Sequence, residues 1–105
     1  MNIGRQPLIR VLRDTRSLLA LPDNDFLWSS WKNAEAALRD IDDFIEKIKS
    51  GVKFNEKDLV VLFAPTGPIQ EVSLSSGWGE RFLALAHRFD IALAWFRISS
   101  ILTKT

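Results

Sequence analysis

Few side chains in this sequence could act as nucleophiles, metal ligands or general bases. The chain of 105 residues contains one histidine, His87, and no cysteine. Cysteine nucleophiles, disulfides and zinc sites built from thiolates or several histidines are therefore ruled out. Asp90 shares a helical face with His87, but no motif places a serine beside the pair. We interpret His87 as a structural residue of an apolar helix.

The turn Pro65-Thr66-Gly67-Pro68 does not have the features of a phosphate-binding loop. It has no Lys-Ser or Lys-Thr pair, and its prolines remove amide donors that would contact a phosphate. The sequence also contains no glycine fingerprint for a dinucleotide. The sequence therefore predicts a protein that is not an enzyme and that binds no cofactor and no metal.

Carboxylates are the most numerous remaining candidates for a functional site. Four of them gather on one side of a predicted helix, with Arg39 among them: Glu35, Asp42, Asp43 and Glu46. That side faces away from the apolar face, so these acids lack the buried setting that acid–base catalysis uses. Two interpretations stay open, a solvated helix face or an acidic surface that selects a basic partner by charge.

Trp78 is a further candidate, because it stands between two glycines in a predicted turn. Gly77 and Gly79 give the backbone the freedom to place the indole ring. The ring either fills the core or serves as an aromatic anchor at an interface, and Trp is common in both uses. We therefore count Trp78 with the four acids as candidate partner-binding residues.

Two helices are predicted in the first half of the chain. Pro7 suits the first turn of a helix that ends near Leu21, because Pro22 follows. Residues 23–25 then offer an N-cap for a second helix, which ends at Gly51 in a left-handed cap. The apolar face of this helix repeats with spacings of three and four residues. Its members are Trp31, Ala34, Leu38, Ile41, Ile45 and Ile48.

The second half of the chain predicts a small β-hairpin and a long final helix. Residues 59–63 form a short apolar run, and residues 69–74 alternate in polarity after a four-residue turn, which is the pattern of two paired strands. The final helix opens at Glu80, and a break would fall at Asp90. Its apolar face is Phe82, Leu85, Ala86, Phe89, Leu93 and Phe96.

These elements together predict a mostly α (α+β) fold. Two N-terminal helices, a short β-hairpin and a long C-terminal helix would form one compact domain over residues 1–105. Hydrophobic residues make up 47% of the chain, which is enough for a single core at this size.

Composition favours a cytoplasmic protein that binds neither nucleic acid nor a membrane. The net charge is only +1, which gives no general attraction for a nucleic acid. The most apolar stretch, residues 82–102, contains His87, Arg88, Asp90 and Arg97, which are costly in a bilayer. We therefore interpret it as a buried helix, and the lack of cysteine fits a reducing compartment.

One further pattern extends over residues 28–90. It joins N-terminal helices containing Trp28 and Trp31 to a strand–turn–strand and a closing helix. The segments that carry it are LFAPTGPIQEVSL (62–74), GWGE (77–80) and FD (89–90). This pattern resembles small bacterial immunity proteins, of the kind paired with contact-dependent growth inhibition toxins and other polymorphic toxins. It is a resemblance of pattern, without a shared contact motif.

The resemblance implies a function in toxin neutralisation. Such a protein would be a cytoplasmic monomer that binds one cognate toxin domain in a 1:1 complex and blocks its active site or substrate groove. Many of these toxins are nucleases with basic grooves, so an acidic helix face would mimic a phosphate backbone. The four acids of the predicted second helix are then the first candidates for contact residues.

Two other functions stay open. The first is a regulatory or scaffold domain that self-associates through its apolar helices. The second is a nucleic-acid binder that uses the basic N-terminal helix, with Arg5, Arg10, Arg13 and Arg16. We rank this second alternative last, because its arginines are spread around the helix.

Overall fold

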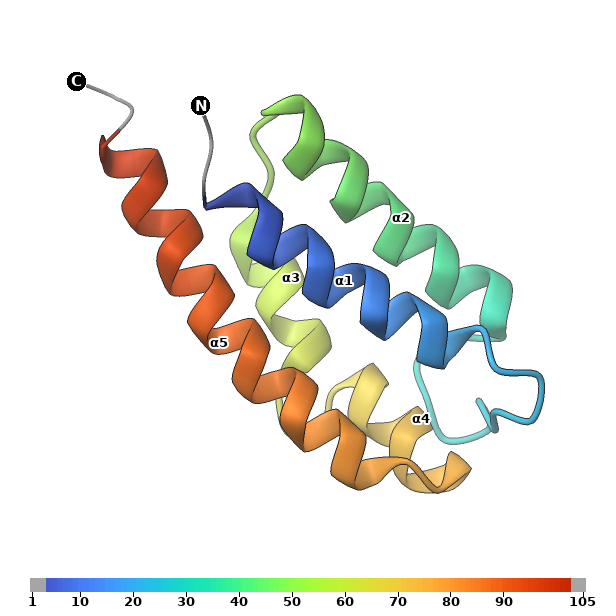
Figure 1. The fold of residues 1–105 in the computed structure, drawn as a ribbon. Helices are drawn as coiled ribbons and strands as arrows, with labels where there is room; N and C mark the ends of the chain where they lie inside the picture. Colours follow the sequence, from blue (N-terminus) through green and yellow to red (C-terminus); the bar gives the residue numbers. More distant parts are fainter. Residues whose placement is uncertain (1–3, 103–105) are drawn as a thin grey trace.

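In the computed structural model, which describes residues 4–102, the chain is built from α-helices joined by turns and loops (Figure 1). Their bounds are α1 Arg5–Leu19, α2 Ala34–Ser50, α3 Glu56–Phe63, α4 Pro68–Ser76 and α5 Gly79–Leu102. α1 packs between α2 and α5, and the short α4 lies beside the start of α5. None of the helices within residues 4–102 combines the length and the apolar character that crossing a lipid bilayer requires.

The core lies where α1 meets α2 and α5, and the short helices α3 and α4 cover its remaining side. Its fully buried large apolar side chains are Leu8, Leu12, Leu19, Ile41, Ile48, Leu59, Ile69, Val72 and Phe89. Phe63 of α3 stacks on Phe89 of α5, with ring centroids 4.1 Å apart. Gly4 allows α1 to begin close to α5, because a Cβ at this position would lie 2.6 Å from Ser99 Cβ.

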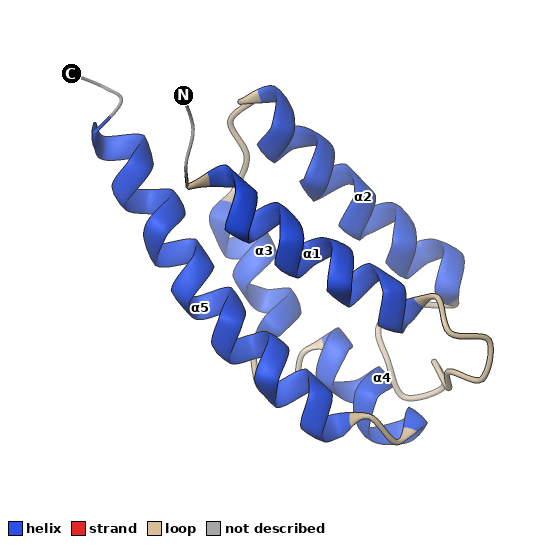
Figure 2. Cartoon of the chain, in the orientation of Figure 1, coloured by secondary structure: helices blue, strands red, loops and turns tan. Residues whose placement is uncertain are grey.

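The predicted β-hairpin is wrong, because both of its strands are helices (Figure 2). The first is α3, whose N-cap is Asn55: the side-chain oxygen of Asn55 accepts a hydrogen bond from the Lys57 N–H at 2.9 Å. Glu56 and Asp58 add negative charge to the first turn, where it favours a helix. Residues 59–63 are a short apolar run, and periodicity alone does not distinguish a buried strand from a buried helix at that length.

The second predicted strand is α4, which is bounded by strong helix signals. Gly67 is its N-cap and Pro68 its first residue, a position for which the fixed φ of proline is already suited. Gly77 ends it with a φ of 86°, in the left-handed region. Ile69 and Val72 are three residues apart and both are fully buried. This is the spacing of one helix face, whereas a strand would bury every second residue.

The second helix begins later than predicted, and Trp31 lies in the loop before it. The N-cap of α2 is Asn33, whose side chain accepts a hydrogen bond from the Ala36 N–H at 3.0 Å. The predicted apolar face holds from Ile41 onward, and Gly51 ends the helix with a φ of 72°, as predicted. The buried residues of α2 are Ala37, Ile41, Ile45 and Ile48.

The final helix, α5, continues past Asp90, so the break predicted there is wrong. The predicted apolar face packs on the core: Phe82, Leu85, Phe89 and Leu93 are buried, and Ala86 and Phe96 are partly buried against them. The side of α5 that faces away from the core is apolar as well.

Candidate functional site

The four predicted acids of α2 lie together on its exposed side. With Leu38 and Arg39 they line one shallow depression: Glu35, Asp42, Asp43 and Glu46. Two of the four are already paired. Asp42 accepts hydrogen bonds of 2.6 and 3.0 Å from Arg16 of α1, and Asp43 Oδ2 lies 2.9 Å from Lys47 Nζ. Among the ion pairs of residues 4–102, none includes Glu35 or Glu46.

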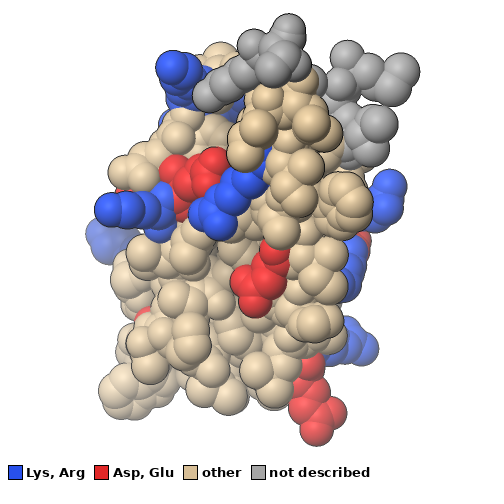
Figure 3. Space-filling view, turned by 90° about the vertical axis from the view of Figure 1, so that its left-hand side faces the viewer, with Lys and Arg blue, Asp and Glu red and all other residues tan. Residues whose placement is uncertain are grey.

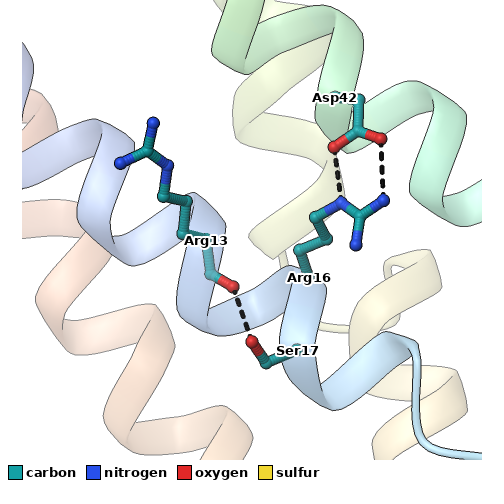
Figure 4. A network of polar contacts seen from close by, with 4 residues as sticks. All are labelled: Arg13, Arg16, Ser17 and Asp42. Carbon is teal, nitrogen blue, oxygen red and sulfur yellow. Dashed lines mark hydrogen bonds and ion pairs between the residues drawn. The ribbon is translucent and has the colours of Figure 1, made fainter.

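The pair of Arg16 and Asp42 joins α1 to α2 at the surface (Figure 4). The hydrogen bond to Asp42 and its negative charge raise the pKa of Arg16 above its ordinary value. Arg13 points away from this pair, and its carbonyl oxygen accepts a hydrogen bond from Ser17 Oγ at 3.2 Å. Both members of the pair are about half exposed, so water and salt screen it and it adds little to stability. Its main effect is to remove part of the negative charge that the helix face was expected to present.

Trp78 lies inside the fold, with 7% of the residue exposed. Its indole Nε1 donates a hydrogen bond of 2.8 Å to Asn24 Oδ1. Asn24 Nδ2 in turn donates to the carbonyl oxygen of Leu18 at 2.7 Å. Of the two roles left open for Trp78, the structure therefore shows the packing role: the ring closes the core and ties the loop after α1 to the start of α5.

The loop of residues 21–33, which joins α1 to α2, is held along its length by hydrogen bonds. Besides Asn24, its first half is held by Asp25, whose N–H donates to Ser76 Oγ of α4 at 2.8 Å. The carboxylate of Asp25 accepts a hydrogen bond from the Leu27 N–H at 2.9 Å, which closes a tight turn. The first half of the loop is therefore tied to α1, α4 and the residue before α5.

The second half of the loop is tied to α2 and α4. Ser29 Oγ donates to the carbonyl oxygen of Pro68 at 3.3 Å and accepts a hydrogen bond from the Trp31 N–H. The Trp31 indole is buried, and its Nε1 donates to Asp40 Oδ2 at 2.8 Å. The buried tryptophans Trp31 and Trp78 thus support the loop from two sides.

Between these two tied halves, Leu27 and Trp28 point into solvent, with 76% and 70% of each residue exposed. Large apolar side chains on a fixed backbone are typical of interface anchors, because little ordering remains to be done on binding. Leu27 borders a shallow depression with Asn33, two residues before Glu35. The exposed pair and the unpaired acid Glu35 therefore lie at the same end of the molecule.

The sequence did not single out Leu27 and Trp28 as a site. The resemblance placed Trp28 in a helix, whereas the structure places it in the loop. The signal that would have found it is the run of turn-forming residues at 23–25, followed within three residues by Trp28. Such a run predicts a turn at Trp28 in place of a helix, although Trp78 shows that a tryptophan after a turn can also be buried.

The other polar side chains considered as functional candidates do not form a site. His87 is exposed on the outer side of α5, and within residues 4–102 no three His, Asp or Glu side chains gather as a metal site would require. Arg16 of the basic N-terminal helix is engaged with Asp42, and Arg5 Nη1 lies 3.5 Å from the Lys49 carbonyl oxygen.

Comparisons with known proteins add no family to these observations. No protein-family model matches the chain, no curated protein matches its sequence, and no solved structure matches its fold. The segment 62–74, which carries the resemblance to immunity proteins as a strand–turn–strand, forms parts of two helices. What remains of that resemblance is therefore its pattern of residues.

Proposed function

We propose that this chain is a protein-binding domain without catalytic activity, which binds and neutralises a bacterial toxin domain in the manner of an immunity protein. The observation that carries the proposal is the exposed pair of Leu27 and Trp28 on a loop fixed by hydrogen bonds. Exposing so much apolar surface is unfavourable in water, and a partner that covers it gains that free energy. The proposal places the protein in the cytoplasm, which suits a chain without cysteine.

In this proposal Trp28 enters an apolar pocket of the toxin domain, and α2 supplies the charge that guides the encounter. Glu35 and Glu46 carry that role, because Asp42 and Asp43 are already paired with cations. Unpaired acids at the rim of an interface speed association with a basic groove and select against other partners. The loop needs no rearrangement, so binding loses little conformational entropy.

The experiment is co-expression with candidate toxin domains, chosen from genes adjacent to that of this chain, followed by purification of any complex and a test of cell survival. We expect a stable complex and protected cells. Trp28→Ala should weaken binding by about 30-fold or more, the loss typical of an interface hot spot. Val61→Ala is a matched control, because Val61 is also an exposed apolar residue but lies on α3, away from the loop.

Two results would contradict the proposal. One is the absence of both complex and protection with the wild-type chain. The other is a complex in which Trp28→Ala binds as tightly as the wild-type chain. Circular dichroism of the Trp28→Ala variant verifies that the helices are intact, which we expect because the side chain is mostly exposed.

A further inference from the structure

Helix α5 is apolar on two opposite faces. Its inner face packs on the core, while on the opposite side several large apolar residues are about half to two-thirds exposed: Ile91, Trp95, Ile98 and Ile101. The small, exposed Ala94 lies among them. Figure 3 faces the side of the molecule on which α5 lies, and uncharged surface covers most of it. A helix that is apolar all round is typical of one that is covered on both sides.

The spacing on this outer face is that of a helix–helix contact. His87, Ile91, Ala94, Ile98 and Ile101 recur at intervals of four, three, four and three residues. This is the heptad spacing with which one helix packs lengthwise on another. α1, α3 and α4 contact α5 from the core side. Ile91 and Trp95 border α1 across a shallow depression, and within residues 4–102 no helix lies over the seam.

We propose that the outer face of α5 binds the same face of a second copy of this chain. The two α5 helices lie antiparallel, across a twofold axis that passes between residues 94 and 95. In this register Ile91 faces Ile98 of the second copy, and Ala94 leaves room for Trp95 of the second copy. Because the interface is isologous, each of these contacts occurs twice.

Charge supports the antiparallel orientation. Asp90 and Arg97 are seven residues apart on one flank of the outer face, so they occupy equivalent heptad positions. In an antiparallel pair, equivalent flanking positions of the two helices lie next to each other, which brings Asp90 of each copy close to Arg97 of the other. Arg97 already donates to Glu56 Oε1 at 2.7 Å, so its guanidinium group would then join two carboxylates. In a parallel pair each of these positions faces the other flank of its partner, so Asp90 and Arg97 would not meet.

The available area suits a dimer of moderate affinity. From their exposed fractions, the residues of this face contribute roughly 500–600 Å² from each copy, or about 1,100 Å² in total. That total falls just below the roughly 1,200–2,000 Å² of stable interfaces, in the range of weak and transient complexes. We therefore expect dissociation at low concentration and a dimer in the micromolar range.

The first test is the mass in solution, measured by light scattering and analytical ultracentrifugation from about 1 μM to about 500 μM. We expect the mass to rise from the 12.0 kDa of one chain toward twice that value. Ile98→Lys should raise the dissociation constant by at least ~100-fold, since it places two charges in the interface. Val61→Lys is the matched control: Val61 is similarly exposed but lies on α3, and this variant should dimerise like the wild-type chain.

The second test fixes the orientation, and it is direct because the chain contains no cysteine. Ala94→Cys, next to the axis, should form a disulfide-linked dimer on mild oxidation, and His87→Cys should not. A mass of one chain at every concentration, or an Ile98→Lys variant that dimerises normally, would overturn the proposal. Cross-linking of both cysteine variants would overturn the antiparallel register. Trp28→Ala should leave the dimer unchanged, so this test is independent of toxin binding.

Discussion

Replacing Asn24 by alanine removes the link between the 21–33 loop and Trp78. Asn24 accepts a hydrogen bond from the Trp78 indole at 2.8 Å and donates one to the Leu18 carbonyl oxygen at 2.7 Å. Asn24→Ala leaves the indole N–H of a residue that is 7% exposed without its partner. An unsatisfied buried donor costs about 1–3 kcal/mol, so we expect the free energy of unfolding to fall by about 2 kcal/mol.

Trp78→Phe removes the donor and keeps most of the ring. In the double variant Asn24→Ala/Trp78→Phe no polar group of the pair is left unsatisfied. The decrease in its free energy of unfolding should therefore be smaller than the sum of the decreases in the two single variants, by about 1 kcal/mol or more. Urea unfolding followed by far-ultraviolet circular dichroism measures all four proteins without relying on tryptophan fluorescence. If the two single losses add to within about 0.3 kcal/mol, the hydrogen bond is not the link that we describe.

The remaining predictions concern glycines and one ion pair. Gly4→Ala should lower the free energy of unfolding by about 1–3 kcal/mol, because its Cβ would lie 2.6 Å from Ser99 Cβ of α5. Gly79→Ala should be neutral or stabilising in the same denaturant assay, because its Cβ would contact only the Leu74 side chain, at 3.1 Å. Gly51→Ala should cost about 1 kcal/mol, because its φ of 72° disfavours a side chain, and thermal unfolding would measure this loss. Asp42→Asn should slightly destabilise the protein at low salt, and this difference should disappear at high salt because the contact with Arg16 is exposed.

The sequence located the three long helices, although it misplaced the start of α2 and a break in α5, and it missed the two short helices for a physical reason. Gly51 ends α2 with an αL conformation that few other residues adopt, so the end of this helix could be located from composition. The two short helices have too few residues for a helical period to be distinguished from a strand. Their identity depends on the caps Asn55 and Gly67 and on Pro68 after Gly67, and these signals lie outside the apolar run that indicated a strand.

The residues of the acidic helix face could be predicted from the sequence, but the ion pairs that they form could not. The exposure of Glu35 and Glu46 follows from their place on the helix, and the structure agrees. The neutralisation of Asp42 by Arg16 depends on how α1 packs on α2, and the two residues are 26 positions apart. The exposure of Trp28 depends on hydrogen bonds from three helices to one loop; the turn-forming residues at 23–25 indicate a turn there but do not encode those contacts.

The 21–33 loop keeps its shape through groups other than the two side chains that it displays. Its hydrogen bonds use backbone atoms and other side chains, while the Leu27 and Trp28 side chains take part in none of them. The side chains that do take part are those of Asn24, Asp25, Ser29, Trp31 and Asn33. Mutations at Leu27 and Trp28 are therefore nearly free of folding constraints. A lineage could exchange one recognition pair for another in a few steps and keep the same frame, and a designed library at residues 27 and 28 would exploit the same freedom.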